Sequence, residues 1–279
     1  MYVARLSFIL ILSLMGFEAS AQQTAPGQNS SSPSAQVSSD APDELVAVPN
    51  RPTITTTAEA VQRGVLEIEH GLELADGHQN MNELLKFGLF KNLELRLASN
   101  PFERDAGVTG FSDTGVGFKF RAVPQKGARP TISLLYTASL PTATHDLGTG
   151  AVGHSIQLLV SKDFGKHHFD VNEGPQFVGR PQGGFDRNYF TSLSYSHPIT
   201  EKVGWTGEIA GFSRTNASTP ATMVLLGALT YTVKPRLVLD AGAFVTVYGN
   251  QPRMVGLIGF TYAISDLYHF HARRNHGSH

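Results

Sequence analysis

Cysteine is absent from the 279 residues of this chain, so no disulfide bond can support its fold. Charge is also scarce, because only 16% of the residues are Asp, Glu, Lys or Arg and the formal net charge is -1. Nucleic-acid-binding proteins usually present a basic surface, so this balance indicates no nucleic-acid partner. Beyond the N-terminus, no apolar run reaches the roughly 18 residues that a transmembrane helix requires.

Sequence motifs of enzymes are missing as well. The chain contains no phosphate-binding GxxxxGK[ST], no GxSxG nucleophile elbow and no HExxH metal motif. The neighbouring polar pairs His145-Asp146 and His167-His168 form no dyad by themselves, because adjacent residues of a strand point to opposite faces. We therefore predict that the protein is not an enzyme and has no catalytic residues, no cofactor-binding residues, no cofactor and no metal site.

The first 21 residues have the features of a secretion signal. Arg5 precedes the apolar run LSFILILSLMGF, and Ala19-Ser20-Ala21 provides a cleavage site before Gln22. We therefore expect a signal peptide over 1–21 and a chain that leaves the cytoplasm. An exported protein without disulfides or a lipid-anchor cysteine needs another source of stability, and a closed hydrogen-bonded barrel is one candidate.

The mature chain divides by composition into three parts. Residues 22–50 are rich in Ser, Gln, Ala and Pro, and such a segment buries too little apolar surface to offset the entropy lost on ordering. We interpret them as a disordered linker, 51–270 as the folded domain, and 271–279 as a flexible His-rich tail.

The residue pattern of the folded domain predicts about twelve β-strands. It contains no long stretch with the 3.6-residue period of a helix. Between 114 and 122, for example, Val116, Phe118 and Phe120 alternate with the basic residues Lys119 and Arg121, which indicates a strand with one apolar and one polar face. The first three strands are expected over 61–75, 84–90 and 93–99.

Connections between these strands alternate in length, beginning with a long loop, ADGHQNMNE, and a tight Lys91-Asn92 turn. A soluble sandwich would also alternate apolar and polar residues. However, charges of both signs occur in mid-strand, and aromatic residues gather near strand ends. These features favour an all-β fold, an antiparallel up-and-down transmembrane β-barrel with long extracellular loops and short periplasmic turns. Such a barrel must close, because lipid offers its backbone no hydrogen-bond partner.

Four stretches of the chain carry a resemblance to a known family. They are RPTITTTAEAVQRGVLEIEHG, LLKFGLFKNLELRL, GFSDTGVGFKFR and SLPTATHDLGTGAVGHSIQLLVSKDFG. Together they resemble the bacterial outer-membrane family labelled Putative MetA-pathway of phenol degradation, most specifically at Asp113 and Gly117 followed by basic residues. The resemblance runs from about Arg51 to Gly165 and more loosely to Tyr262. It implies an outer-membrane barrel, often called a transporter, and little about its cargo.

We therefore predict an outer-membrane protein that crosses the inner membrane by secretion and acts as a passive channel or transporter for small solutes, including small hydrophobic or aromatic compounds. Its expected partners are outer-membrane lipid, a small-molecule solute and the barrel assembly machinery. Selectivity in such pores comes from charges in the lumen. The candidates for these lumen-lining residues are Glu67, Glu69, Glu73, Lys86, Glu94, Arg96, Lys119, Arg121, His168, Asp170, Glu208 and Asp240.

Three alternatives stay open at this point. The same charged residues could form a closed network of ion pairs that plugs the barrel, and about twelve strands do not decide between a filled and an open lumen. A structural or adhesive barrel would instead bind partners through its long loops, especially 99–113 and 141–153. An outer-membrane lipid-modifying enzyme would need convergent His, Ser and acidic groups at the rim.

Overall fold

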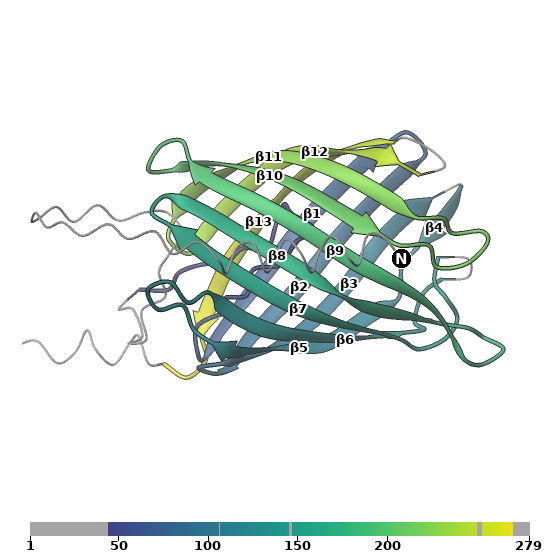
Figure 1. The fold of residues 1–279 in the computed structure, drawn as a ribbon, viewed down its shortest axis with the longest axis horizontal. Helices are drawn as coiled ribbons and strands as arrows, with labels where there is room; N and C mark the ends of the chain where they lie inside the picture. Colours follow the sequence, from purple (N-terminus) through teal and green to yellow (C-terminus); the bar gives the residue numbers. More distant parts are fainter. Residues whose placement is uncertain (1–43, 106, 145–146, 250–252, 270–279) are drawn as a thin grey trace, which may run out of the picture.

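The computed structural model describes residues 44–105, 107–144, 147–249 and 253–269. Within these ranges, the search for an α-helical membrane span is negative. One antiparallel sheet of thirteen strands curls into a barrel (Figure 1). Its strands are β1 (Val65–Ala75), β2 (His78–Phe90), β3 (Leu93–Asp105), β4 (Val108–Gly110), β5 (Thr114–Val123), β6 (Thr131–Leu140), β7 (Gly153–Phe164), β8 (His167–Gly179), β9 (Phe185–Pro198), β10 (Val203–Phe212), β11 (Thr222–Lys234), β12 (Leu237–Tyr248) and β13 (Met254–Asp266).

Twelve of these strands close the barrel in an up-and-down order. The short strand β4 pairs only with the end of β3, so β3 continues the barrel by pairing with β5. The last strand, β13, pairs antiparallel with β1 from Val65 to Leu74 and completes the ring. The predicted all-β, up-and-down barrel of about twelve strands is thus confirmed.

One connection differs from the sequence-based expectation. The predicted long loop ADGHQNMNE is a two-residue turn at Asp76-Gly77, because β2 begins at His78, which pairs with Ala75. Gly77 adopts a φ of 67° there, a conformation that glycine enters at little cost. Residues 78–82 are mostly polar on both faces and carry no apolar alternation, so only pairing with β1 and β3 reveals them as strand.

The two faces of the barrel have opposite chemistry. Outward-facing residues are apolar, as shown by Val116 and Phe120, which are 36% and 40% exposed. Inward-facing residues are largely polar or charged, and Lys86, Lys119 and Glu94 are all fully buried. The alternation in 114–122 therefore places its apolar face on the outer surface and its basic side chains in the lumen.

Aromatic side chains form a band around the outer face near the short turns. Trp205 contacts Tyr195 edge to face at 5.8 Å between ring centroids, and Tyr195 lies 5.1 Å from Phe169. On the far side of the barrel, Tyr268 meets Phe87 at 5.7 Å. Aromatic rings concentrate at membrane–water interfaces, so this band marks the level at which one interface meets the barrel.

Candidate functional site

The lumen contains a segment of the chain itself. Residues 46–62, which we call the collar, form no strand and run once around the inner wall (purple in Figure 1). Their partners follow the order of the strands around the sheet, from β1 through β12, β10, β9, β8, β7, β6 and β5 to β3. In chain order, hydrogen bonds or ion pairs join Val48 to Glu67, Asn50 to Glu69, Arg51 to Asp240, Thr55 to Glu208, Thr56 to Asn172, Ala58 to Ser161, Glu59 to Arg121 and Val61 to Glu94.

The collar extends into residues that composition assigned to the linker. Ala47, Val48 and Asn50 are all buried, and the backbone N–H of Ala47 donates to the carbonyl of Pro235 at 2.9 Å. The boundary expected at Arg51 thus falls inside one continuous lumen segment, and β1 starts at Val65 rather than at 61. The signal sequence, residues 22–43 and the tail 271–279 lie outside the described residues.

Glu208 on β10 is the anchor on the wall opposite β1. One carboxylate oxygen accepts from the backbone N–H and the hydroxyl of Thr55, both at 2.6 Å. The other accepts from the N–H of Ile54 at 2.9 Å. No cation forms a salt bridge with Glu208 among the described residues, so this carboxylate serves the collar backbone.

Six of the predicted lumen residues form one buried ionic cluster beneath the collar. Lys86 lies 2.5 Å from Glu67 and also contacts Glu69, while its ammonium donates to the carbonyl of Val48 at 2.6 Å. The second half centres on Glu94, which pairs with Arg96 at 3.0 Å and with Lys119 at 3.4 Å. Three cations and three anions balance here, as buried charges require.

The other predicted residues lie apart from this cluster. Glu73 lies toward the long-loop end, where it accepts from Asn82 at 2.7 Å. His168 joins Asp163 at 2.7 Å to Asp170 at 3.0 Å at the short-turn end. Arg121 pairs with Glu59 at 2.6 Å. The structure thus places all of these candidates on the inner wall, but several face the collar rather than an open passage.

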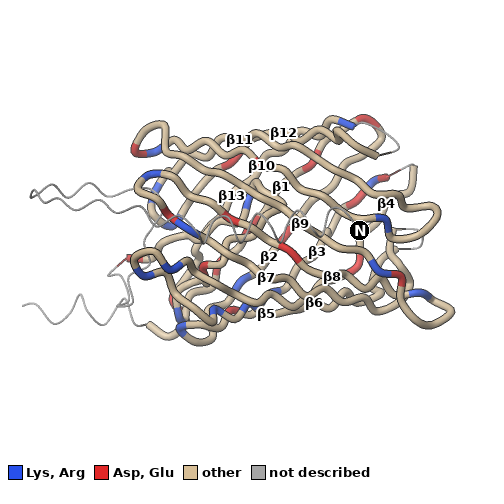
Figure 2. The backbone as a smooth tube through the Cα atoms, viewed as in Figure 1, with Lys and Arg blue, Asp and Glu red and all other residues tan. Residues whose placement is uncertain are grey.

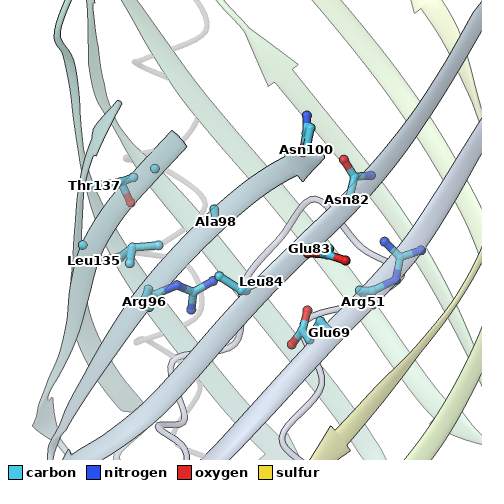
Figure 3. A pocket seen from close by; sticks show the side chains of 12 residues that line it. Arg51, Glu69, Asn82, Glu83, Leu84, Arg96, Ala98, Asn100, Leu135 and Thr137 are labelled. Carbon is cyan, nitrogen blue, oxygen red and sulfur yellow. The ribbon is translucent and has the colours of Figure 1, made fainter. Parts of the chain in front are cut away.

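A cavity of about 280 Å³ lies beside the collar, between it and the long-loop end. Figure 3 shows Arg96 projecting into it from β3 and Arg51 at its edge, with Asn100 and Thr137 along its wall. Its floor is apolar, because Leu84, Ala98 and Leu135 face inward from β2, β3 and β6, where polar residues otherwise prevail. The cavity therefore offers a small molecule both an apolar surface and hydrogen-bond donors.

Two glycines make room for the side chain of Arg51. A Cβ at Gly71 would lie 2.0 Å from its guanidinium carbon, and one at Gly259 would lie 2.5 Å from its Nε. The guanidinium lies 3.3 Å from Asp240 on β12. The side chain of Arg51 thus lies along the inner face of β1 and β13 and connects the collar to β12.

The sequence pattern predicted that the lumen charges line a pore and gave no indication of the collar. The run TITTTAEA has no apolar alternation and resembles a linker in composition. One available signal was the inward face of β8 to β10, where Asn172, Ser192 and Glu208 occur with few cations. Polar side chains without charge partners require other hydrogen-bond partners, and the collar backbone supplies them.

A closed twelve-stranded barrel with an apolar outer face, an aromatic band and a polar lumen defines a porin-like outer-membrane β-barrel. The family described as Putative MetA-pathway of phenol degradation matches residues 49–264. The chain belongs to this family, and the resemblance drawn from its motifs is confirmed. The match begins within the collar, so the collar is part of the region that the family shares.

Solved structures of outer-membrane channels share the fold. An outer membrane channel from Pseudomonas putida F1 is 11% identical, with a TM-score of 0.59 over 77% of this chain and 99% of that one. The NanC porin is 11% identical, with a TM-score of 0.55 over 71% of this chain and 100% of that one. The KdgM porin is 9% identical, with a TM-score of 0.54 over 71% and 99%. Among curated proteins, none matches the sequence.

Proposed function

We propose that this protein is a passive outer-membrane channel for small solutes, including small hydrophobic or aromatic compounds, and that the collar restricts passage through its lumen. The observation that carries the proposal is the collar's attachment. Inward side chains of the successive strands accept hydrogen bonds from its backbone around almost the whole wall. The collar does not pair with any strand. Such a segment can shift without opening the barrel.

The cavity beside the collar supports the choice of solute. Leu84, Ala98 and Leu135 provide an apolar surface, and Arg96 and Thr137 provide donors beside it. A hydrocarbon body with one polar group would satisfy both parts of this lining. A large, fully polar solute would leave the apolar floor in contact with nothing but water.

The test is a bilayer conductance measurement on a protein in which the collar can be tethered. The chain has no cysteine, so a Thr55→Cys/Ser192→Cys pair introduces a single possible disulfide where the two hydroxyl oxygens lie 2.8 Å apart. We expect discrete conductance steps in the reduced protein and markedly smaller or rarer steps after oxidation, with recovery when the disulfide is reduced again.

A matched pair provides the control. Thr114 and Thr142 have hydroxyl oxygens that are also 2.8 Å apart, but they join β5 to a long loop away from the collar. Oxidising a Thr114→Cys/Thr142→Cys variant should leave the conductance unchanged. Equal conductance of the oxidised and reduced collar pair would contradict the role of the collar, and a silent bilayer from folded wild-type protein would contradict the channel itself.

A further inference from the structure

The connections at the short-turn end of the barrel share one feature, which is a cationic side chain. This holds for Arg63, in the segment before β1, and for the connections β2–β3, β5–β6, β7–β8, β9–β10 and β11–β12. We call one exposed residue in or directly beside each connection the basic rim: Arg63, Lys91, Lys126, Lys166, Lys202 and Lys234. Arg129 and Arg236 add further positive charge to two of these connections.

Charge is distributed unequally between the two ends of the barrel. Figure 2 shows blue segments predominating at the short-turn end, on the left, with some red among them, whereas red and blue are more evenly mixed at the long-loop end. Acidic residues at the short-turn end are fewer, with Glu201 and Asp266 among them. The near-zero net charge of the whole chain therefore conceals a positive ring at one end.

Cations at this end lie over the outer aromatic band. The guanidinium of Arg236 lies 5.1 Å from the ring centre of Tyr262, and that of Arg63 lies 5.7 Å from the ring centre of Tyr268. On the opposite side of the barrel, Lys162 on β7 lies 5.6 Å from the ring centre of Phe164. Long basic side chains and aromatic rings at one level are typical of the zone where lipid headgroups meet a membrane protein.

We propose that the basic rim binds the phosphate groups of anionic phospholipids in the membrane leaflet at the short-turn end. The cations follow the complete circumference, and the lipid annulus is the partner that contacts the whole circumference of a barrel. A basic side chain near an anionic leaflet contributes on the order of a fivefold preference for the anionic lipid. This role is separate from conduction through the lumen.

Trp205 provides a direct measurement. It is the only tryptophan of the chain, it is 41% exposed on the outer face of β10, and it lies close to the turn that carries Lys202. The full-length protein is refolded into phosphatidylcholine vesicles that contain the same fraction of brominated phosphatidylglycerol or brominated phosphatidylcholine. We expect stronger quenching of Trp205 by the brominated anionic lipid. The association constant of phosphatidylglycerol at the barrel should exceed that of phosphatidylcholine about fivefold.

Variants locate the preference on the rim. In a Lys166→Gln/Lys202→Gln/Lys234→Gln protein, both brominated lipids should quench Trp205 equally. This variant lacks the three rim cations nearest to Trp205. An Arg180→Gln/Arg187→Gln/Arg214→Gln protein loses the same charge at the long-loop end and should keep the wild-type preference. If the triple lysine variant fails to insert, Lys202→Gln alone should still lower the preference.

Two results would overturn the proposal. One is equal quenching by both lipids in the wild-type protein. The other is an anionic preference that survives the lysine substitutions, since the preference would then arise elsewhere on the barrel. A preference that also declines as salt is added supports binding by charge.

Discussion

At the scale of single residues, four acidic side chains of the lumen accept hydrogen bonds from the collar backbone. A segment without regular structure has no internal partners for its N–H groups, and buried N–H groups need partners. Glu67, Glu94 and Glu208 each accept such a hydrogen bond, at 2.6–2.9 Å. Their charge therefore favours one path of the collar around the wall rather than a permeating ion.

Glu208→Gln tests this role. The amide nitrogen of glutamine cannot accept a hydrogen bond, so either Ile54 or Thr55 loses its partner, and a hydrogen bond to a charged group contributes about 1.5–3 kcal/mol. We expect the collar to detach more often near residue 55. A Thr56→Cys reporter, buried in the native lumen at 8% exposure, should react with a maleimide at least about tenfold faster in the Glu208→Gln background.

The control for this experiment is Glu201→Gln. Glu201 is exposed on the β9–β10 turn, so its substitution removes the same charge without touching the collar. Unchanged labelling of Thr56→Cys in the Glu208→Gln protein would show that the carboxylate does not hold the collar.

At the scale of elements, Asp113 links β5 to the long loop that follows β6. One of its carboxylate oxygens accepts from the N–H of Ala143 at 3.2 Å, and the other accepts from the N–H and hydroxyl of Thr149 at 3.0 and 3.3 Å. Gly148 lies directly against it, because a Cβ there would be 2.5 Å from a carboxylate oxygen. This residue of the family motif therefore has a structural role at the long-loop end.

Asp113→Ala should release this loop without affecting the barrel. The three hydrogen bonds vanish together, while the pairing of β5 with β3 and β6 does not involve the Asp113 side chain. We expect thermolysin, which cuts before apolar residues such as Leu147, to cleave the loop several-fold faster in the variant. Asp186→Ala, near the start of β9 at the same end of the barrel, is the control. Equal cleavage of the wild-type and Asp113→Ala proteins would argue against the link.

At the scale of the whole molecule, barrel closure does not depend on the collar. β13 pairs with β1 over ten residue pairs, and each remaining strand pairs with its neighbours through its own backbone. The collar contributes hydrogen bonds inside the lumen, mostly from its backbone to side chains of the wall, and no strand pairing. We therefore expect the barrel to fold without the collar.

Deleting residues 46–62 should therefore give a folded barrel with a wider passage. Water entering the lumen would hydrate the acids that the collar now covers, which limits the cost of leaving them without partners. We expect larger single-channel conductance than in the wild-type protein, together with retained β-sheet circular dichroism. A deletion protein that fails to fold would show that the collar is needed for assembly, and one with wild-type conductance would show that passage avoids the collar.

The sequence by itself determined the all-β class, the number of strands and the two faces of the barrel, while the secretion signal stays a prediction. These properties follow from local patterns. Period-two alternation, as in Val116 to Arg121, reports which residues share a face, and turn residues such as Lys91-Asn92 report where strands end. Family membership could be recognised for the same reason, because its motifs are continuous stretches.

Only the tertiary structure decided what the lumen residues contact. Glu208 and Thr55 are 153 residues apart in sequence, and no local pattern relates a carboxylate on one strand to a backbone N–H in a Thr-rich segment. The collar has no periodicity of its own, since its conformation follows the wall that surrounds it. Its hydrogen bonds exist only once the twelve strands have closed into a ring and brought their inward side chains around one axis.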